Sequence, residues 1–95
     1  DMTGGLTGEV HAGVHLASDD GVSWAPCTPP KAYSRRVVWG DGSVTVQGSL
    51  ERPQLLIEDG RPTHLFAATA DGPGGFRNAA NTWNMVIPLA PEAPR

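Results

Sequence analysis

A few residues in this sequence carry side chains that could bind a ligand or take part in catalysis. Glu51 and Arg52 stand together before Pro53, and the planar guanidinium of Arg52 can hydrogen-bond sugar hydroxyls or a carboxylate as a fork. His11 and His15 fall on one face of an expected strand, which would aim both imidazoles at one ligand or metal ion. A zinc site needs three or four convergent ligands, which the sequence does not show. We therefore expect no metal and no cofactor.

Composition excludes several classes of protein. Seven basic and 10 acidic residues give a net charge of -3, so no basic stripe exists to neutralise nucleic-acid phosphates. The hydrophobic share of 39% is too high for a disordered chain, and no apolar run approaches the roughly 20 residues of a membrane helix. The single cysteine, Cys27, rules out an internal disulfide framework. We expect one small β domain, or part of a larger one, with no nucleic-acid or membrane partner.

Strand signals recur along the chain, whereas every helical periodicity is broken by Gly or Pro. The pairs Asp41-Gly42 and Asp59-Gly60 supply the positive φ angles of tight hairpin turns. The sequence predicts an all-β fold of short antiparallel strands, with no helix longer than two turns. The expected strands lie near residues 10–17, 36–39, 43–47, 54–58, 62–69 and 82–88.

One faint internal repeat is present. The pairs Asp20-Gly21 and Asp71-Gly72 each follow a strand end with a small hydroxyl residue and precede an aromatic residue. They lie about 50 residues apart, and periods of about 40–50 residues are typical of β-propeller blades. Asp-Gly turns are common in any β protein, so the alternative is that the two turns are unrelated and mark no repeat.

Longer stretches of the sequence resemble a known family. In their order, they resemble the C-terminal portion of five-bladed β-propeller proteins related to glycoside hydrolase family 43, and the resemblance covers residues 1–90. It implies a partial β-propeller of about two blades, followed by a Pro-rich tail at 91–95. It also implies that the chain is a fragment, in keeping with a start at Asp1. The stretches are DMTGGLTG at 1–8, SDDGVSW at 18–24, WGDG at 39–42, LERPQLL at 50–56, LFAA at 65–68 and NMVIPL at 84–89.

The resemblance implies a carbohydrate-active protein that binds or cleaves glycosidic bonds. Related propellers carry a Glu-x-Pro triplet whose carboxylic acid protonates the leaving-group oxygen, which would make Glu51 catalytic. His11 would lie near the sugar, and Arg52 and Trp83 are the other candidate substrate contacts. Glycoside hydrolysis needs two carboxyl groups roughly 5–9.5 Å apart, and one such triplet is visible. We therefore expect the main catalytic acids to lie outside this chain, and the chain alone to show no glycosidase activity.

Each of these residues has a structural alternative. Glu51 could pair with Arg52 or Arg36 and fix the entry of its strand. The rings of Trp24 and Trp39 are expected to pack between blades, as large aromatics commonly do in propellers. For the whole chain, the alternative is a non-catalytic β module that binds sugar or only assembles with copies of itself.

Two blades would leave the flanks of their sheets open. Apolar side chains such as Trp24, Trp39, Leu55 and Phe66 would then face water, and burying them would be strongly favourable. Open strand edges also offer unpaired backbone groups to another chain. We therefore expect association, either with the remaining propeller blades as a second chain or with copies of this chain.

Overall fold

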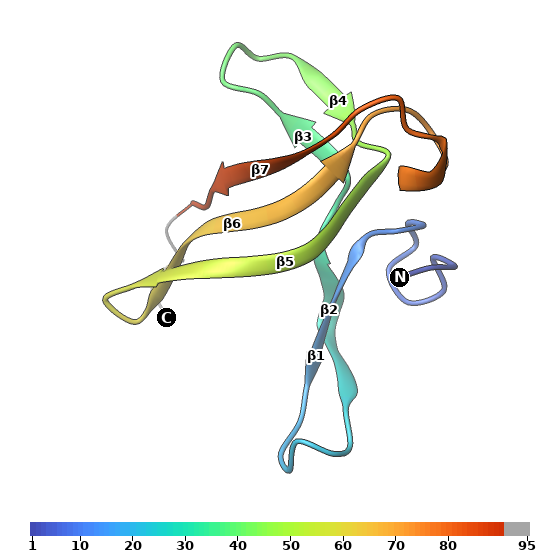
Figure 1. Ribbon diagram of the computed structural model, residues 1–95. Helices are drawn as coiled ribbons and strands as arrows, with labels where there is room; N and C mark the ends of the chain where they lie inside the picture. The colour runs from blue at the N-terminus through green and yellow to red at the C-terminus, as the bar shows by residue number, and fades with distance from the viewer. Residues whose placement is uncertain (91–95) are drawn as a thin grey trace. The chain divides into compact units, whose positions relative to one another are not determined.

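The computed structural model describes residues 1–90 and shows an all-β chain with antiparallel strand pairs (Figure 1). Its one helical element is the three-residue 3₁₀ turn η1 (Phe76–Asn78). The residues form two compact units that divide between Gln47 and Gly48. The predicted all-β, antiparallel fold is therefore confirmed. The predicted tail at 91–95 lies outside the described residues.

The first unit consists of two separate two-stranded sheets, in which β1 pairs with β2 and β3 pairs with β4. The β3–β4 hairpin turns at the predicted Asp41-Gly42 pair, where Gly42 has φ 86° and the Asp41 carboxylate accepts the backbone N–H of Ser43. The predicted turn is confirmed. The four strands are β1 (Gly13–Ala17), β2 (Ala25–Tyr33), β3 (Arg36–Val38) and β4 (Val44–Val46).

Strand β2 was not expected, because its sequence APCTPPKAY contains three prolines. Proline cannot donate to a strand ladder, and it is tolerated where the N–H side needs no partner. Among residues 1–90, β2 pairs with β1 alone, and their register shifts twice, which leaves room for residues without a ladder hydrogen bond. The close approach of Gly13 to the Tyr33 ring fixes the far end of this pair, since a Cβ at Gly13 would overlap the ring.

Strand β1 begins at Gly13, later than the expected start at residue 10. The chain turns at His11, which has φ 63° and lies in the left-handed region rather than in extended backbone. His11 and His15 therefore do not share one strand face, and that expectation is wrong. The reason is local: the backbone N–H of His11 donates to the carbonyl of Asp1 and closes a loop before the strand starts.

The second unit is one three-stranded sheet in the order β5–β6–β7 (Figure 1). Its first two strands join at the predicted hairpin turn, where Asp59 has φ 51° and Gly60 has φ 76°. Positive φ at both central residues matches the twist of the flanking strands. The three strands are β5 (Ser49–Glu58), β6 (Arg61–Ala70) and β7 (Thr82–Pro88).

The two faces of this sheet differ sharply in exposure. Directly paired residues on neighbouring antiparallel strands lie on the same face, and successive residues alternate. Ala67 pairs with Met85, and both are buried, whereas Phe66 pairs with Val86, and both are exposed. One face of the sheet thus supplies most of the unit's core. Its buried members include Leu50, Leu65, Ala67, Thr69 and Met85.

The sheets of residues 1–90 contain two, two and three strands. A propeller blade is a four-stranded sheet, so the blade arrangement remains a hypothesis. None of the helical segments in the described part of the chain has the length and apolar character needed to cross a membrane.

Candidate functional site

A β-bulge interrupts strand β5 at Arg52 and Pro53. Between the paired residues Glu51 and Gln54, β5 has two residues where β6 has one. Arg52 takes φ 53°, a left-handed conformation that residues other than glycine rarely adopt. Pro53, which has no N–H to donate, fits a position where the ladder is broken. Bulges change the direction in which a side chain points, and this one acts on Arg52.

The bulge borders a shallow hollow of about 340 Å³ on the β5–β6–β7 sheet. The hollow lies on the exposed face, because Phe66 pairs with both Gln54 and Val86. Phe66 is 45% exposed, so an aromatic surface is open to a ligand. The residues that line the hollow are Arg52, Gln54, Phe66, Ala67, Ala68 and Asn84.

Glu51 lies beside this hollow. It is half-buried and pairs with Ala68, which is one of the lining residues. Its carboxylate forms no ion pair with Arg52 within residues 1–90, so that part of the structural alternative for Glu51 is not seen. Glu51 and Arg52 are the two predicted site residues that the structure brings to one place.

The other carboxylate on strand β5 is too far away to form a catalytic pair with Glu51. Glu58 lies at the far end of the same strand. At about 3.3 Å per residue, seven residues separate the two positions by on the order of 20 Å. Glycoside hydrolysis uses carboxyl groups roughly 5–9.5 Å apart. This sheet therefore offers at most one of the two groups.

The remaining predicted contacts lie elsewhere. Trp83 pairs with Thr69, whose side chain is buried on the opposite face from Phe66. His11 belongs to the loop before β1 in the first unit. The structure therefore places Trp83 on the face opposite the hollow at Arg52, and His11 in the other unit of the chain. Within residues 1–90, no group of three or more His, Cys, Asp or Glu side chains is placed to hold a metal ion.

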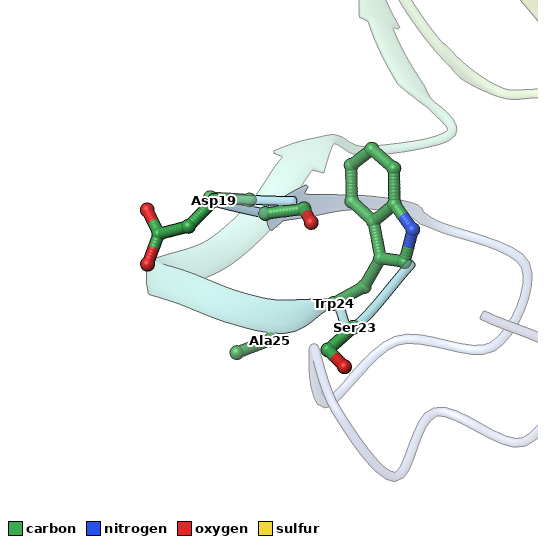
Figure 2. Close-up of a pocket in the computed structure, with 6 residues that line it drawn as sticks. Asp19, Ser23, Trp24 and Ala25 are labelled. Atoms are coloured by element: carbon green, nitrogen blue, oxygen red, sulfur yellow. The ribbon is translucent and has the colours of Figure 1, made fainter. Parts of the chain in front are cut away.

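A second shallow hollow, of about 320 Å³, lies at the turn between β1 and β2 (Figure 2). Its main feature is Trp24, which is 59% exposed. The backbone that carries Trp24 is fixed by Asp20, whose carboxylate accepts the N–H groups of Ser23 and Val22. These bonds, together with one from the Ser18 hydroxyl, lower the pKa of Asp20. Asp20 therefore caps the backbone of this turn.

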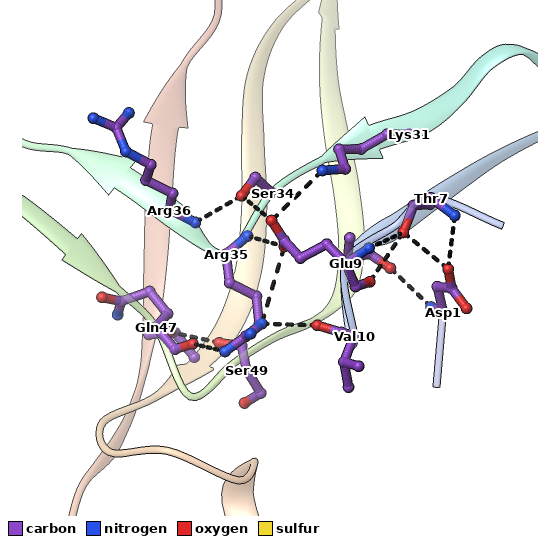
Figure 3. Close-up of polar contacts among 12 residues, drawn as sticks. Asp1, Thr7, Glu9, Val10, Lys31, Ser34, Arg35, Arg36, Gln47 and Ser49 are labelled. Carbon is purple, nitrogen blue, oxygen red and sulfur yellow. Dashed lines mark hydrogen bonds and ion pairs between the residues drawn. The ribbon is translucent and has the colours of Figure 1, made fainter. Parts of the chain in front are cut away.

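Glu9 is the centre of a polar network that holds the first unit together (Figure 3). Its carboxylate accepts the hydroxyl of Ser34 at 2.6 Å and the backbone N–H of Arg35 at 3.0 Å, and it lies 3.6 Å from the Lys31 ammonium. The hydrogen bond from Ser34, then that from Arg35, lowers the pKa of Glu9, and the two cations add to this. Because Glu9 holds three segments together, its role is structural rather than catalytic.

We expect the network to make stability fall in acid. A carboxyl group with a lowered pKa in the folded state stabilises the fold at neutral pH, and this is lost as the pH falls through that pKa. Glu9→Gln should therefore lower the free energy of unfolding by about 1 kcal/mol at pH 7. The difference from the parent should shrink at about pH 3, as urea titrations at both values would show.

Asp19→Asn is the control for this change, because no ion pair or side-chain hydrogen bond of Asp19 is present in the described chain. It should leave stability unchanged at both pH values. An equal effect of the two substitutions, or a Glu9→Gln effect that grows in acid, would contradict the role assigned to Glu9.

We also expect the left-handed backbone at Arg52 to lower the stability of the fold, a cost that a glycine at this position would avoid. A side chain in the left-handed region costs roughly 1 kcal/mol, which glycine avoids. Arg52→Gly should therefore be more stable to urea than Arg52→Ala by about 1 kcal/mol, since both lack the guanidinium and only alanine keeps Cβ. An alanine variant as stable as the glycine variant would show that the bulge imposes no strain.

The sequence did not single out Gln54, Phe66 and Asn84 as site residues. Each lay in an expected strand, but only the register of three strands shows that they meet on one face. The signal that could have found them is the alternation in β6, where the bulky Phe66 falls out of step with Leu65 and Ala67.

In comparisons with known proteins, no family model, no curated protein and no solved structure matches the chain.

Proposed function

We propose that this chain is part of a carbohydrate-active β-propeller of the glycoside hydrolase type, and that the hollow at Arg52 is a sugar-binding site. The observation that carries the proposal is the combination of side chains around the hollow. Arg52, Gln54 and Asn84, which carry a guanidinium and two amides, line the hollow together with the exposed Phe66.

This combination suits a sugar for two chemical reasons. Guanidinium and amide groups are planar and offer several donors or acceptors, which match the neighbouring hydroxyls of a pyranose. An aromatic ring offers an apolar face against which the C–H face of the sugar can pack. Ligand sites in general combine an apolar surface with a few polar groups that fix orientation.

The site favours binding over cleavage by this chain alone. Glu51 stands beside the hollow, where it could act on a bound sugar, but Glu58 lies on the order of 20 Å along the strand. A second carboxyl group would have to come from elsewhere in the protein. The alternative, a non-catalytic sugar-binding module, rests on the same hollow and differs only in lacking that partner.

Binding should depend on the exposed ring. Phe66→Ala should weaken the binding of a methyl glycoside by about tenfold in isothermal titration calorimetry, because stacking of a ring is worth roughly 1 kcal/mol or more. The control is Leu55→Ala: Leu55 is similarly exposed, at 53%, but pairs with Leu65 on the other face. Equal losses in the two variants would contradict a site at Phe66.

Cleavage should be absent. The purified chain should show no turnover of aryl-glycosides above the buffer rate, since the β5–β6–β7 sheet offers one carboxylate beside the hollow and hydrolysis needs two. Turnover that disappears in Glu51→Gln would make Glu51 catalytic within this chain and overturn that expectation. Turnover that survives in Glu51→Gln and stays with the chain through a second purification step would also overturn that expectation, with a carboxylate other than Glu51 responsible.

A further inference from the structure

The guanidinium of Arg52 carries a positive charge that no other residue lining the hollow balances. It forms no ion pair within residues 1–90, and the residues that line the hollow with it carry no carboxylate. We propose that the Arg52 hollow selects a sugar that bears a carboxylate, a uronic acid. The inference rests on the sugar-binding function proposed above and names the class of sugar.

The backbone at Arg52 supports this choice. A φ of 53° is a conformation in which glycine would be free of strain, and yet the position holds a long cationic side chain. Strained positions of this kind persist only where the surrounding structure enforces them, and they cluster at active sites and ligand sites. Here the strained residue lines the hollow, so the task is contact with a ligand.

The chemistry of the lining points to an anion that is also a sugar. A guanidinium binds a carboxylate through two parallel N–H bonds, which a single hydroxyl cannot match. The amides of Gln54 and Asn84 can donate to the same carboxylate or to ring hydroxyls, while Phe66 takes the apolar face. A bare carboxylate would use Arg52 but leave the ring without a partner.

Glu51 provides an opposing charge that makes the inference sharper. It pairs with Ala68, next to the hollow, but is not itself a lining residue. Its carboxylate should repel an anionic sugar over a longer distance than that at which Arg52 attracts it. Removal of the two charges should therefore move the affinity for a uronic acid in opposite directions. The affinity for a neutral sugar should change less, because Arg52 offers it only hydrogen bonds to hydroxyls.

The test compares two matched ligands, methyl β-D-glucuronide and methyl β-D-glucoside, by isothermal titration calorimetry on the purified chain at low ionic strength. The pair differs in the carboxylate alone. We expect the glucuronide to bind about tenfold more tightly than the glucoside. Arg52→Gln should abolish this preference, and Arg52→Lys should restore only part of it, because an ammonium lacks the fork. Circular dichroism checks that both variants fold.

Glu51→Gln tests the inference without any change at Arg52, because it should strengthen the binding of the glucuronide by more than it changes the binding of the glucoside. Equal binding of the two ligands, or a preference that survives Arg52→Gln, would overturn the selection of acid while the sugar site stands. Failure of both ligands to bind would overturn the sugar site itself. Acetate that binds as tightly as the glucuronide would show that the ligand is a simple carboxylate and would also overturn the inference.

Discussion

Replacement of Gly48 by alanine should destabilise the second unit more than any other small change in this chain. A Cβ at Gly48 would overlap the carbonyl oxygen of Gly72 and lie 2.9 Å from that of Asp71, so main-chain atoms would have to move. The N–H of Gly48 also donates to the carbonyl of Ala70 at 2.8 Å, which ties the start of β5 to the end of β6. We expect a loss of about 2–3 kcal/mol in the free energy of unfolding.

Gly40→Ala is the matched control for Gly48→Ala. Gly40 has no positive φ, and a Cβ there would meet no atom within 4 Å. The control should change stability by less than about 0.5 kcal/mol in urea titrations. If the two glycine variants unfold at the same urea concentration, the close crossing at Gly48 does not exist in solution.

The second large effect concerns association. One face of the β3–β4 sheet carries Val38, Val44 and Val46, which are 61%, 45% and 62% exposed. The pairing of Val38 with Val44 shows that these side chains share a face. Leu55 and Phe66, whose exposure the sequence predicted, are 53% and 45% exposed. Burial of such surface is favourable by about 25 cal/mol per Å².

We therefore expect the purified chain to have a mass well above 10.0 kDa in size-exclusion chromatography with light scattering. The double variant Val38→Thr and Val46→Thr keeps the β-branched shape, removes apolar surface and should shift the chain toward the monomer. Val22→Thr is the control, because Val22 is 82% exposed but lies in the turn between β1 and β2. A monomer that melts cooperatively would contradict the incomplete-propeller proposal.

The parts of the fold that were predictable have a local cause. The hairpin at Asp59-Gly60 follows from the positive φ that both residues tolerate, and strand β7 has the predicted bounds because its apolar run ends at proline. Strand β2 was missed because its prolines argue against a strand, and only pairing with β1 overrides them. Such pairing is a property of the folded chain, not of a short window.

The candidate site was predictable only in part for the same reason. Glu51 and Arg52 could be selected from residue type, but the bulge at Arg52 and the hollow that it borders depend on the register with β6. Asn84 reaches the same place from β7, about 30 residues later in the sequence, through its pairing with Ala68. Trp83 shows the converse, because one step along the strand places it on the opposite face.

The most direct test of the sugar site is chemical-shift mapping of the ¹⁵N-labelled chain with methyl β-D-glucuronide and methyl β-D-glucoside. We predict that the largest shifts fall on the amides of Arg52, Gln54, Phe66 and Asn84, with smaller shifts at Glu51. Shifts confined to residues 17–25 would move the site to the hollow at Trp24 and contradict the assignment. The absence of any shift with either sugar at saturating concentration would contradict carbohydrate binding by this chain.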